Sequence, residues 1–349
     1  MAADRTLPWR RRPLRRRLNS ALDAIVRRRV VVADQVLDVY LASVYTGVIV
    51  GTGVIFALAS QRPMSLSVIG GLVVMIAALS FGLFESTKLV RRPHALLRWA
   101  KKGVYHFQIV ALTFTVAVLE LAGEPVLSYL AVMVIGMIVY QAFGRIGCFM
   151  AGCCHGRPST WGVRYGGQHA ETGYPYFVQG TRLFPIQLIE AIWLAVLGAG
   201  LIIAFLDDAP AGTIVAWYIV GYGATRFLLE FLRGDTHRIF AWRLSEPQWT
   251  AVLLGSGVVG LELAGVLPLV WPNVALVASM LAVAITVMSP ARLRATKFTT
   301  RLRNGDAGRV QRTVDQVLRD AGLSPVQLGE RQATDDGLTV IYLPRRGRS

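Results

Sequence analysis

The sequence predicts an all-α integral membrane protein, a polytopic bundle of about seven or eight transmembrane helices. Of its 349 residues, 54% are hydrophobic and only 17% are charged, and the mean hydropathy is +0.48. The charged residues collect at the two ends and in a few loops between long apolar stretches. This composition excludes an ordinary soluble globular domain and favours a membrane-embedded helical bundle.

Eight apolar stretches are each near the ~20 residues that a helix needs to cross a bilayer. A break from Pro268 to Pro272 alone separates the last two, so the count of eight depends on it. We expect a basic N-terminal tail over 1–39, a transmembrane domain over 40–290 and a basic C-terminal tail over 291–349. The expected spans cover residues 40–60, 65–86, 105–122, 127–147, 185–206, 211–232, 249–270 and 273–289.

The two tails have little sequence signal. Residues 1–39 contain ten arginines, and Leu18, Leu22, Ile25 and Val26 fall on one helical face. This pattern fits either a basic amphipathic helix on an anionic membrane or an unstructured tail. In the C-terminal tail, Val310 to Leu318 have helical spacing, and 338–343 reads as a short strand.

The net charge of +16 is explained by a membrane rather than by nucleic acid, because the basic residues flank apolar spans. Lysine and arginine sort onto one side of the predicted bundle, and the other side receives only Arg62. By the positive-inside rule, both termini and the 144–184 loop are expected in the cytoplasm.

The most unusual stretch runs from residue 144 to 165, at the end of an apolar span. It contains five glycines, three arginines, His155 and all three cysteines of the chain. Glycines permit close backbone approach, and arginine can hold a phosphate through two parallel hydrogen bonds. A tight helix hairpin with arginines reaching to the interface is the alternative. The candidate binding residues here are Gly144, Arg145, Gly147, Cys148, Gly156 and Arg157.

The cysteines allow two further interpretations. Cys148, Cys153 and Cys154 lack CxxC spacing, and no second ligand cluster exists, so neither a metal nor a cofactor is expected. A thiolate nucleophile at Cys153 or Cys154 is chemically reasonable, because neighbouring positive charge lowers the pKa of a thiol.

Ionisable residues within membrane spans are costly and are therefore candidates for a site. His106 begins one span, and Gln187 and Glu190 lie one helical turn apart near the start of another. Arg226, Glu230 and Arg233 share one helix face at i, i+4 and i+7. An intrahelical ion pair between Arg226 and Glu230, and an interfacial hydrogen bond for His106, are the structural alternatives.

Four motifs, taken together, resemble those of the prolipoprotein diacylglyceryl transferase family. They agree with the family in order and spacing from about residue 40 to 270. They are Gly144-Arg145-Ile146-Gly147-x-Phe149 with Gly152, Gly156 and Arg157; Pro185-x-Gln187-Leu188-x-Glu190; Gly221 to Arg233; and Ser245-Glu246-Pro247-Gln248.

The resemblance implies transfer of the diacylglyceryl group of phosphatidylglycerol to a lipobox cysteine of a prolipoprotein, with release of glycerol phosphate and without a cofactor. Arg145 and Arg226 would hold the lipid phosphate, and His106 matches the family histidine proposed to help deprotonate the thiol. Gln187, Glu190 and Glu230 would order the arginines. The implied location is the bacterial inner membrane.

The chain also departs from the family pattern. Cys148 and Cys153 stand where the family has Asn and Glu, and His106-Phe107-Gln108 replaces His-Gly-Gly. These differences leave two alternatives open: a paralogue that serves another acceptor through a cysteine nucleophile, or a non-catalytic phospholipid-binding or transport protein. The family signature faces outward, whereas the charge distribution here places it inside.

Overall fold

The computed structural model describes residues 13–32, 35–89, 104–171, 179–234, 240–289, 331–333 and 339–341. The chain divides into two compact units. One comprises residues 29–157 and 185–284, and the other comprises 1–28, 158–184 and 285–349. We call them the helical unit and the peripheral unit, and each is described by itself.

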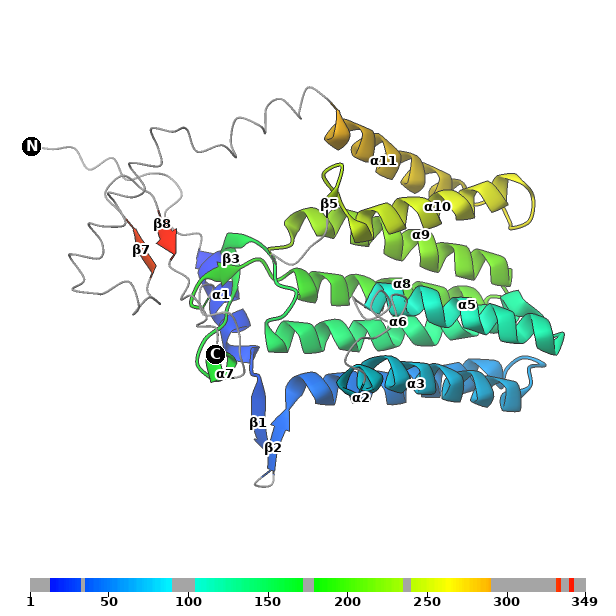
Figure 1. Cartoon of the computed structure of the whole chain (residues 1–349), viewed down its shortest axis with the longest axis horizontal. Coiled ribbons are helices and arrows are strands. Elements are labelled where there is room, and N and C mark those ends of the chain that lie inside the picture. The colour runs from blue at the N-terminus through cyan, green and yellow to red at the C-terminus, as the bar shows by residue number, and fades with distance from the viewer. Residues whose placement is uncertain are drawn as a thin grey trace, which may run out of the picture. The chain divides into compact units, whose positions relative to one another are not determined.

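The helical unit consists of long helices that lie side by side, roughly horizontal in the view of Figure 1. A helix coincides with every predicted span, and the prediction of a polytopic helical membrane protein is confirmed. By length and composition, α2, α6, α8 and α11 can each cross a membrane. The helices are α2 Val39–Ala59, α3 Leu66–Leu89, α5 Val104–Ala122, α6 Val126–Ala151, α8 Ile186–Leu206, α9 Ala211–Leu229, α10 Glu246–Leu263 and α11 Trp271–Met288.

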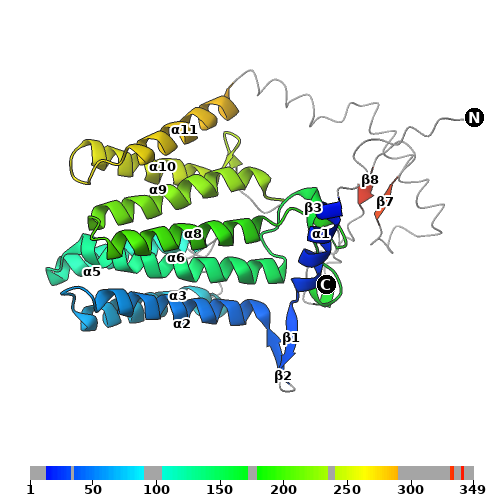
Figure 2. The same ribbon diagram turned by 180° about the vertical axis from the view of Figure 1, so that it is seen from behind.

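Helix α6 is the centre of this unit and packs against α2, α8 and α9. In its most apolar window 61% of residues are buried, compared with 22% in α2 and in α11. The view from behind shows α6 between α8 and the pair of α2 and α3 (Figure 2). Apolar side chains on the outer helices are exposed instead, as at Ile49 and Leu253. Such an outer surface suits lipid, because lipid tails are as apolar as the side chains that face them.

Small residues bring α2 and α6 close together. A Cβ atom on Gly51 would lie 2.7 Å from the carbonyl oxygen of Gly136, and one on Gly47 would lie 2.8 Å from Cβ of Phe143. Small residues at such spacing let helix backbones approach closely, which is how membrane helices gain packing energy without a hydrophobic driving force. This contact fixes α6, the helix that ends in the glycine- and cysteine-rich stretch.

Local signals set several helix ends. The Asp38 carboxylate accepts hydrogen bonds from the backbone N–H groups of Tyr40 and Leu41 at 2.9 and 3.2 Å and so begins α2. Ser245 and Gln248 form a reciprocal capping box that begins α10. Gly152, in the left-handed region at φ 80°, ends α6.

Short strands accompany the helices of this unit. Strand β1 Arg29–Val32 pairs antiparallel with β2 Gln35–Asp38, directly before α2. A second hairpin of β5 Phe240–Ala241 and β6 Leu244–Ser245 leads into α10. A 3₁₀ turn, η2 Glu230–Leu232, continues α9.

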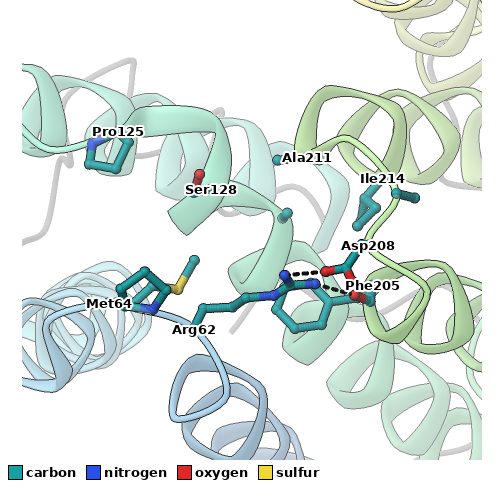
Figure 3. A pocket seen from close by; sticks show the side chains of 11 residues that line it. Arg62, Met64, Pro125, Ser128, Phe205, Asp208, Ala211 and Ile214 are labelled. Carbon is teal, nitrogen blue, oxygen red and sulfur yellow. Dashed lines mark hydrogen bonds and ion pairs between the residues drawn. The ribbon is translucent and has the colours of Figure 1, made fainter.

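The helix ends on the side away from the glycine-rich stretch enclose a pocket of about 290 Å³ (Figure 3). Arg62 forms an ion pair with Asp208, and its Nη2 donates to the carbonyl oxygen of Phe205 at 2.7 Å. Arg62 thereby joins the loop between α2 and α3 to the loop between α8 and α9. Arg62, which the sequence analysis placed as the single basic residue on this side, is thus paired with an acidic residue.

The peripheral unit contains α1 Pro13–Ile25, β3 Pro158–Arg164, α7 Gln168–Glu171 and β4 Arg182–Leu183. The carboxylate of Asp23 accepts from the Arg164 backbone N–H at 2.9 Å and from Nη2 of Arg182 at 2.7 Å. Part of the N-terminal tail thus forms a helix, one of the two alternatives that the sequence left open. Of the four apolar residues expected on one face, Leu22 and Val26 are buried, whereas Leu18 and Ile25 are exposed.

The C-terminal region contributes β7 Arg331–Ala333, which pairs antiparallel with β8 Thr339–Ile341. The predicted strand at 338–343 is confirmed over β8. The helical spacing from Val310 to Leu318 lies outside the described residues.

Candidate active site

Ion pairs join the ends of α6, α8 and α9 within the helical unit. Glu190 of α8 lies between two arginines: its Oε1 is 3.0 Å from Nη2 of Arg145, and its Oε2 is 3.8 Å from Nη1 of Arg226. Glu230 continues the network, with its Oε2 3.0 Å from Nη2 of Arg226 and 3.7 Å from Nη1 of Arg233. Three segments distant in sequence thus supply one cluster of alternating charges.

The helix periodicity predicted only part of this cluster. The spacing of Arg226, Glu230 and Arg233 put them on one face, and the i, i+4 ion pair is present. The link to Arg145 through Glu190 depends on tertiary packing. We call Arg145, Glu190, Arg226, Glu230 and Arg233 the Arg–Glu cluster.

The cluster is buried and carries an excess of positive charge. The exposed fraction of the side chain is 14% for Arg145, 6% for Arg226 and 2% for Glu190. Three guanidinium groups and two carboxylates leave one formal positive charge. Among the described residues of the cluster, Nη1 of Arg226 is a buried donor without a hydrogen-bond partner. Because a buried charge is costly unless it is paired, this arrangement favours an anionic ligand.

A sharp chain reversal follows α6. Gly152 donates its backbone N–H to the carbonyl oxygen of Cys148 at 3.0 Å, and Cys154 also has a positive φ, of 54°. A non-glycine residue in the left-handed region is uncommon and costs conformational energy. The reversal brings the thiol of Cys153 to 3.9 Å from the Cys148 carbonyl oxygen.

The three cysteine sulfurs lie within 4.8 Å of one another. Hydrogen bonds from Cys148 and Cys153 lower the pKa of Cys154, and the positive charges of Arg145 and Arg233 add to the effect. Hydrogen bonding to Cys148 and Cys154 raises the pKa of Cys153. Of the two thiols that the sequence analysis left open as nucleophiles, Cys154 therefore has the environment that favours ionisation more than that of Cys153.

Backbone hydrogen bonds fasten this loop to the end of α9. Arg157 donates its backbone N–H to the carbonyl oxygen of Leu232, and Gly234 donates to that of His155, both at 2.9 Å. The backbones of Gly156 and Arg233 form an isolated antiparallel β-bridge. A Cβ on Gly234 would collide with the Gly156 backbone, so glycine is needed for this close approach. The loop and the Arg–Glu cluster are thereby held together.

Gln187 and Gln248 position these elements from two sides. Nε2 of Gln187 donates to the carbonyl oxygen of Cys153 at 2.7 Å, which connects α8 to the cysteine loop. Nε2 of Gln248 donates to the carbonyl oxygen of Phe227 at 3.1 Å, which connects α10 to α9 next to Arg226. The sequence analysis singled out Gln187 but gave Gln248 no role.

Tyr222 is a site residue that the sequence analysis missed. Its phenol is buried on α9 beside Arg145 and Glu190. Its position one helical turn before Arg226, on the same face, was the available signal.

The remaining predicted residues have mixed environments. Gly147 contacts α2, where a Cβ would lie 3.2 Å from Tyr40 and Ser43, whereas the space beside Gly144 is open. Arg157 is exposed, and its Nε donates to the carbonyl oxygen of Arg233 at 3.4 Å. His106 lies on α5, but its side chain is outside the described part of the chain.

One known family matches most of the chain. The profile of the prolipoprotein diacylglyceryl transferases matches residues 24–263, more than half of the chain. The chain belongs to this family. The matched range contains all five residues of the Arg–Glu cluster and all three cysteines.

Curated relatives from the family match in part. A phosphatidylglycerol–prolipoprotein diacylglyceryl transferase of Clostridium tetani is 35% identical over 112 residues, covering 32% of this chain and 43% of the relative. A second, from Clostridium perfringens, is 28% identical over 173 residues, or 48% of this chain and 62% of the relative. A third, from Dehalococcoides mccartyi, is 32% identical over 129 residues, or 37% and 48%. The matched segments thus span about half the length of these relatives.

Proposed function

We propose that this protein transfers the diacylglyceryl group of phosphatidylglycerol to the thiol of a prolipoprotein cysteine, as a multi-pass enzyme of the bacterial plasma membrane. The chain belongs to the transferase family, and the named relatives carry out the reaction with phosphatidylglycerol and a prolipoprotein. The reaction needs no cofactor, because it is a displacement in which the phosphate ester is itself the leaving group.

The single observation that carries the proposal is the buried excess charge of the Arg–Glu cluster. Its one formal positive charge matches the one negative charge of a phosphodiester. Arg145 and Arg226 face the same carboxylate from different helices, so a phosphate placed between them can accept from both guanidinium groups. A neutral lipid headgroup would leave this charge unbalanced.

The same cluster suits the charge change during reaction. The attacking thiolate forms a C–S bond to the terminal glyceryl carbon, and the bond between that carbon and the phosphate oxygen breaks with its electron pair on oxygen. The phosphate then gains one negative charge on becoming a monoester, and the proton lost by the acceptor thiol passes to the medium or to that phosphate. Arginines aimed at this oxygen therefore bind the transition state more tightly than the substrate.

Other residues would support this step. Glu190 and Glu230 hold the guanidinium groups in place, and Gln187 fixes the adjacent loop. His106 remains our candidate for helping to remove the acceptor proton. A glyceryl intermediate on a cysteine of this chain would be a thioether. The sulfur of a thioether is a poor leaving group, so such an intermediate would not pass the glyceryl group on. The alternative role of Cys153 or Cys154 as a nucleophile therefore requires an acyl group, which can leave a thioester.

The test is the release of glycerol phosphate from headgroup-labelled phosphatidylglycerol by the purified protein, with and without a lipobox peptide. We expect peptide-dependent release, and a loss of about 10²–10³-fold in kcat/KM for Arg145→Ala, the usual effect of removing one donor to a developing oxyanion. Arg145→Lys keeps the positive charge but cannot donate two parallel hydrogen bonds to the phosphate, so its kcat/KM should fall by less than that of Arg145→Ala. Arg62→Ala removes an arginine at the opposite helix ends and should leave the rate unchanged.

The outcomes separate the alternatives. Release without the peptide would point to another acceptor, and tight phosphatidylglycerol binding without turnover would favour a binding or transport protein. Equal rates for the unsubstituted protein, Arg145→Ala and Arg226→Ala would refute the proposed role of the cluster.

The charge distribution favours a cytoplasmic position for the termini and for the site, as a further part of the proposal. On the opposite side, Arg62 is paired with Asp208, so that side has no unbalanced basic residue among the described loops. Reporter fusions after residues 124, 168 and 209 test this orientation. An external signal at 168 would reverse it.

A further inference from the structure

We propose that Cys148, Cys153 and Cys154 form a three-thiolate site for a thiophilic d¹⁰ metal ion, with Zn²⁺ as the representative ion. The metal ligands are different residues from those proposed to hold the lipid phosphate, although Arg145 and Arg233 lie beside both sites. The spacing of the cysteines in the sequence gave no indication of such a site, since it lacks the paired CxxC pattern. The fold nevertheless brings the three sulfurs close together.

The first support is the geometry of the three sulfurs. A metal–sulfur bond of about 2.3 Å places the sulfurs of a tetrahedral or trigonal site about 3.8–4.0 Å apart. The three Sγ atoms already lie within 4.8 Å of one another. Each sulfur–sulfur separation therefore needs to shorten by about 1 Å at most, which side-chain rotation supplies.

The second support is the backbone that creates this grouping. Cys148 is on the last turn of α6, and left-handed backbone at Gly152 and Cys154 turns the chain back on itself. Cys154 holds a conformation that costs energy for a residue with a Cβ atom, and such strain persists only where surrounding contacts impose it. Hydrogen bonds from Gln187 to Cys153 and from Gly234 to His155 supply those contacts.

The third support is charge. Three thiolates around a divalent d¹⁰ ion carry one net negative charge. Arg145 and Arg233 lie close enough to act electrostatically on Cys154 and can balance that charge.

The coordination sphere would stay open at one position. Three side chains, those of the cysteines, are grouped closely enough to be ligands of one ion. His155 is not among them, and its Nδ1 lies 3.0 Å from the carbonyl oxygen of Gly156. Cys153 is exposed, whereas Cys148 and Cys154 are partly buried. An ion can therefore enter from the Cys153 side and keep a fourth position for water or for a small ligand.

The test is titration of the reduced, purified full-length protein with Cd²⁺ alone, followed through the ultraviolet sulfur-to-cadmium charge-transfer absorption. We expect saturation at one ion per chain and displacement by Zn²⁺. Cys148→Ser, Cys153→Ser and Cys154→Ser should each weaken binding by more than the roughly 10- to 100-fold that loss of a group supporting a ligand costs. His155→Gln, a matched change next to the site, should retain the band.

A second measurement uses the unsubstituted protein, so it does not depend on the folding of a variant. Zn²⁺ should protect all three cysteines together from N-ethylmaleimide, as read by mass spectrometry of the peptides. Absence of the cadmium band in the folded, reduced protein would overturn the proposal. An undiminished band in all three serine variants, or zinc protection of Cys153 alone, would overturn it as well.

Discussion

Replacing Glu190 by glutamine tests the Arg–Glu cluster most directly. Glu190 is 2% exposed and lies 3.0 Å from Arg145 and 3.8 Å from Arg226. The substitution keeps the size of the side chain and removes one negative charge. The formal charge of the cluster then rises from one positive to two positive, with only Glu230 left to oppose three guanidinium groups.

The expected cost follows from this burial. Removing one partner of a buried ion pair costs about 3–5 kcal/mol, because the remaining charge is left uncompensated. Glutamine still accepts a hydrogen bond from one arginine, so we expect about 3 kcal/mol, or a shift of about 100-fold in the unfolding equilibrium. An anionic lipid phosphate can replace the missing charge. The loss should therefore shrink when phosphatidylglycerol is present.

The assay is denaturant unfolding in micelles of a zwitterionic detergent, with and without added phosphatidylglycerol. Glu120→Gln is the matched control, because it makes the same change at an exposed position on α5. It should unfold as the unsubstituted protein does in both conditions. If Glu190→Gln unfolds at the same denaturant concentration as the unsubstituted protein, or if the anionic lipid restores nothing, the charge argument fails.

Three further predictions concern packing, the thiols and the capping of α10. Gly136→Val should lower the midpoint of thermal unfolding, by an amount equivalent to about 1–3 kcal/mol, because α2 leaves no room for a side chain there. Alkylation of Cys154 should persist to lower pH than for an ordinary thiol, because its pKa is lowered and its thiolate survives on acidification. Arg145→Ala should move that pH profile upward, and an unmoved profile would contradict the electrostatic contact. Gln248→Ala should cost about 1–2 kcal/mol in denaturant unfolding, because it removes the capping box and the bond to the Phe227 carbonyl; an unchanged midpoint would show that neither contact contributes.

The sequence by itself determined the membrane class and the helix positions. Apolar stretches of bilayer length are a local property of the chain, so each predicted span coincides with a helix. The i, i+4 pair of Arg226 and Glu230 is also local, because both lie on one helix and its periodicity places them together. The motifs that identified the family were readable for the same reason, since they are short continuous segments.

Tertiary structure alone decided which of these local features meet. Arg145 reaches Glu190 because close packing brings α6 and α8 together, and no periodicity within one segment contains that contact. The three thiols gather because left-handed backbone at Gly152 and Cys154 reverses the chain, whereas their spacing alone suggested no ligand set. A helix specifies its own faces, but the partner of each face is set by the packing of the whole bundle.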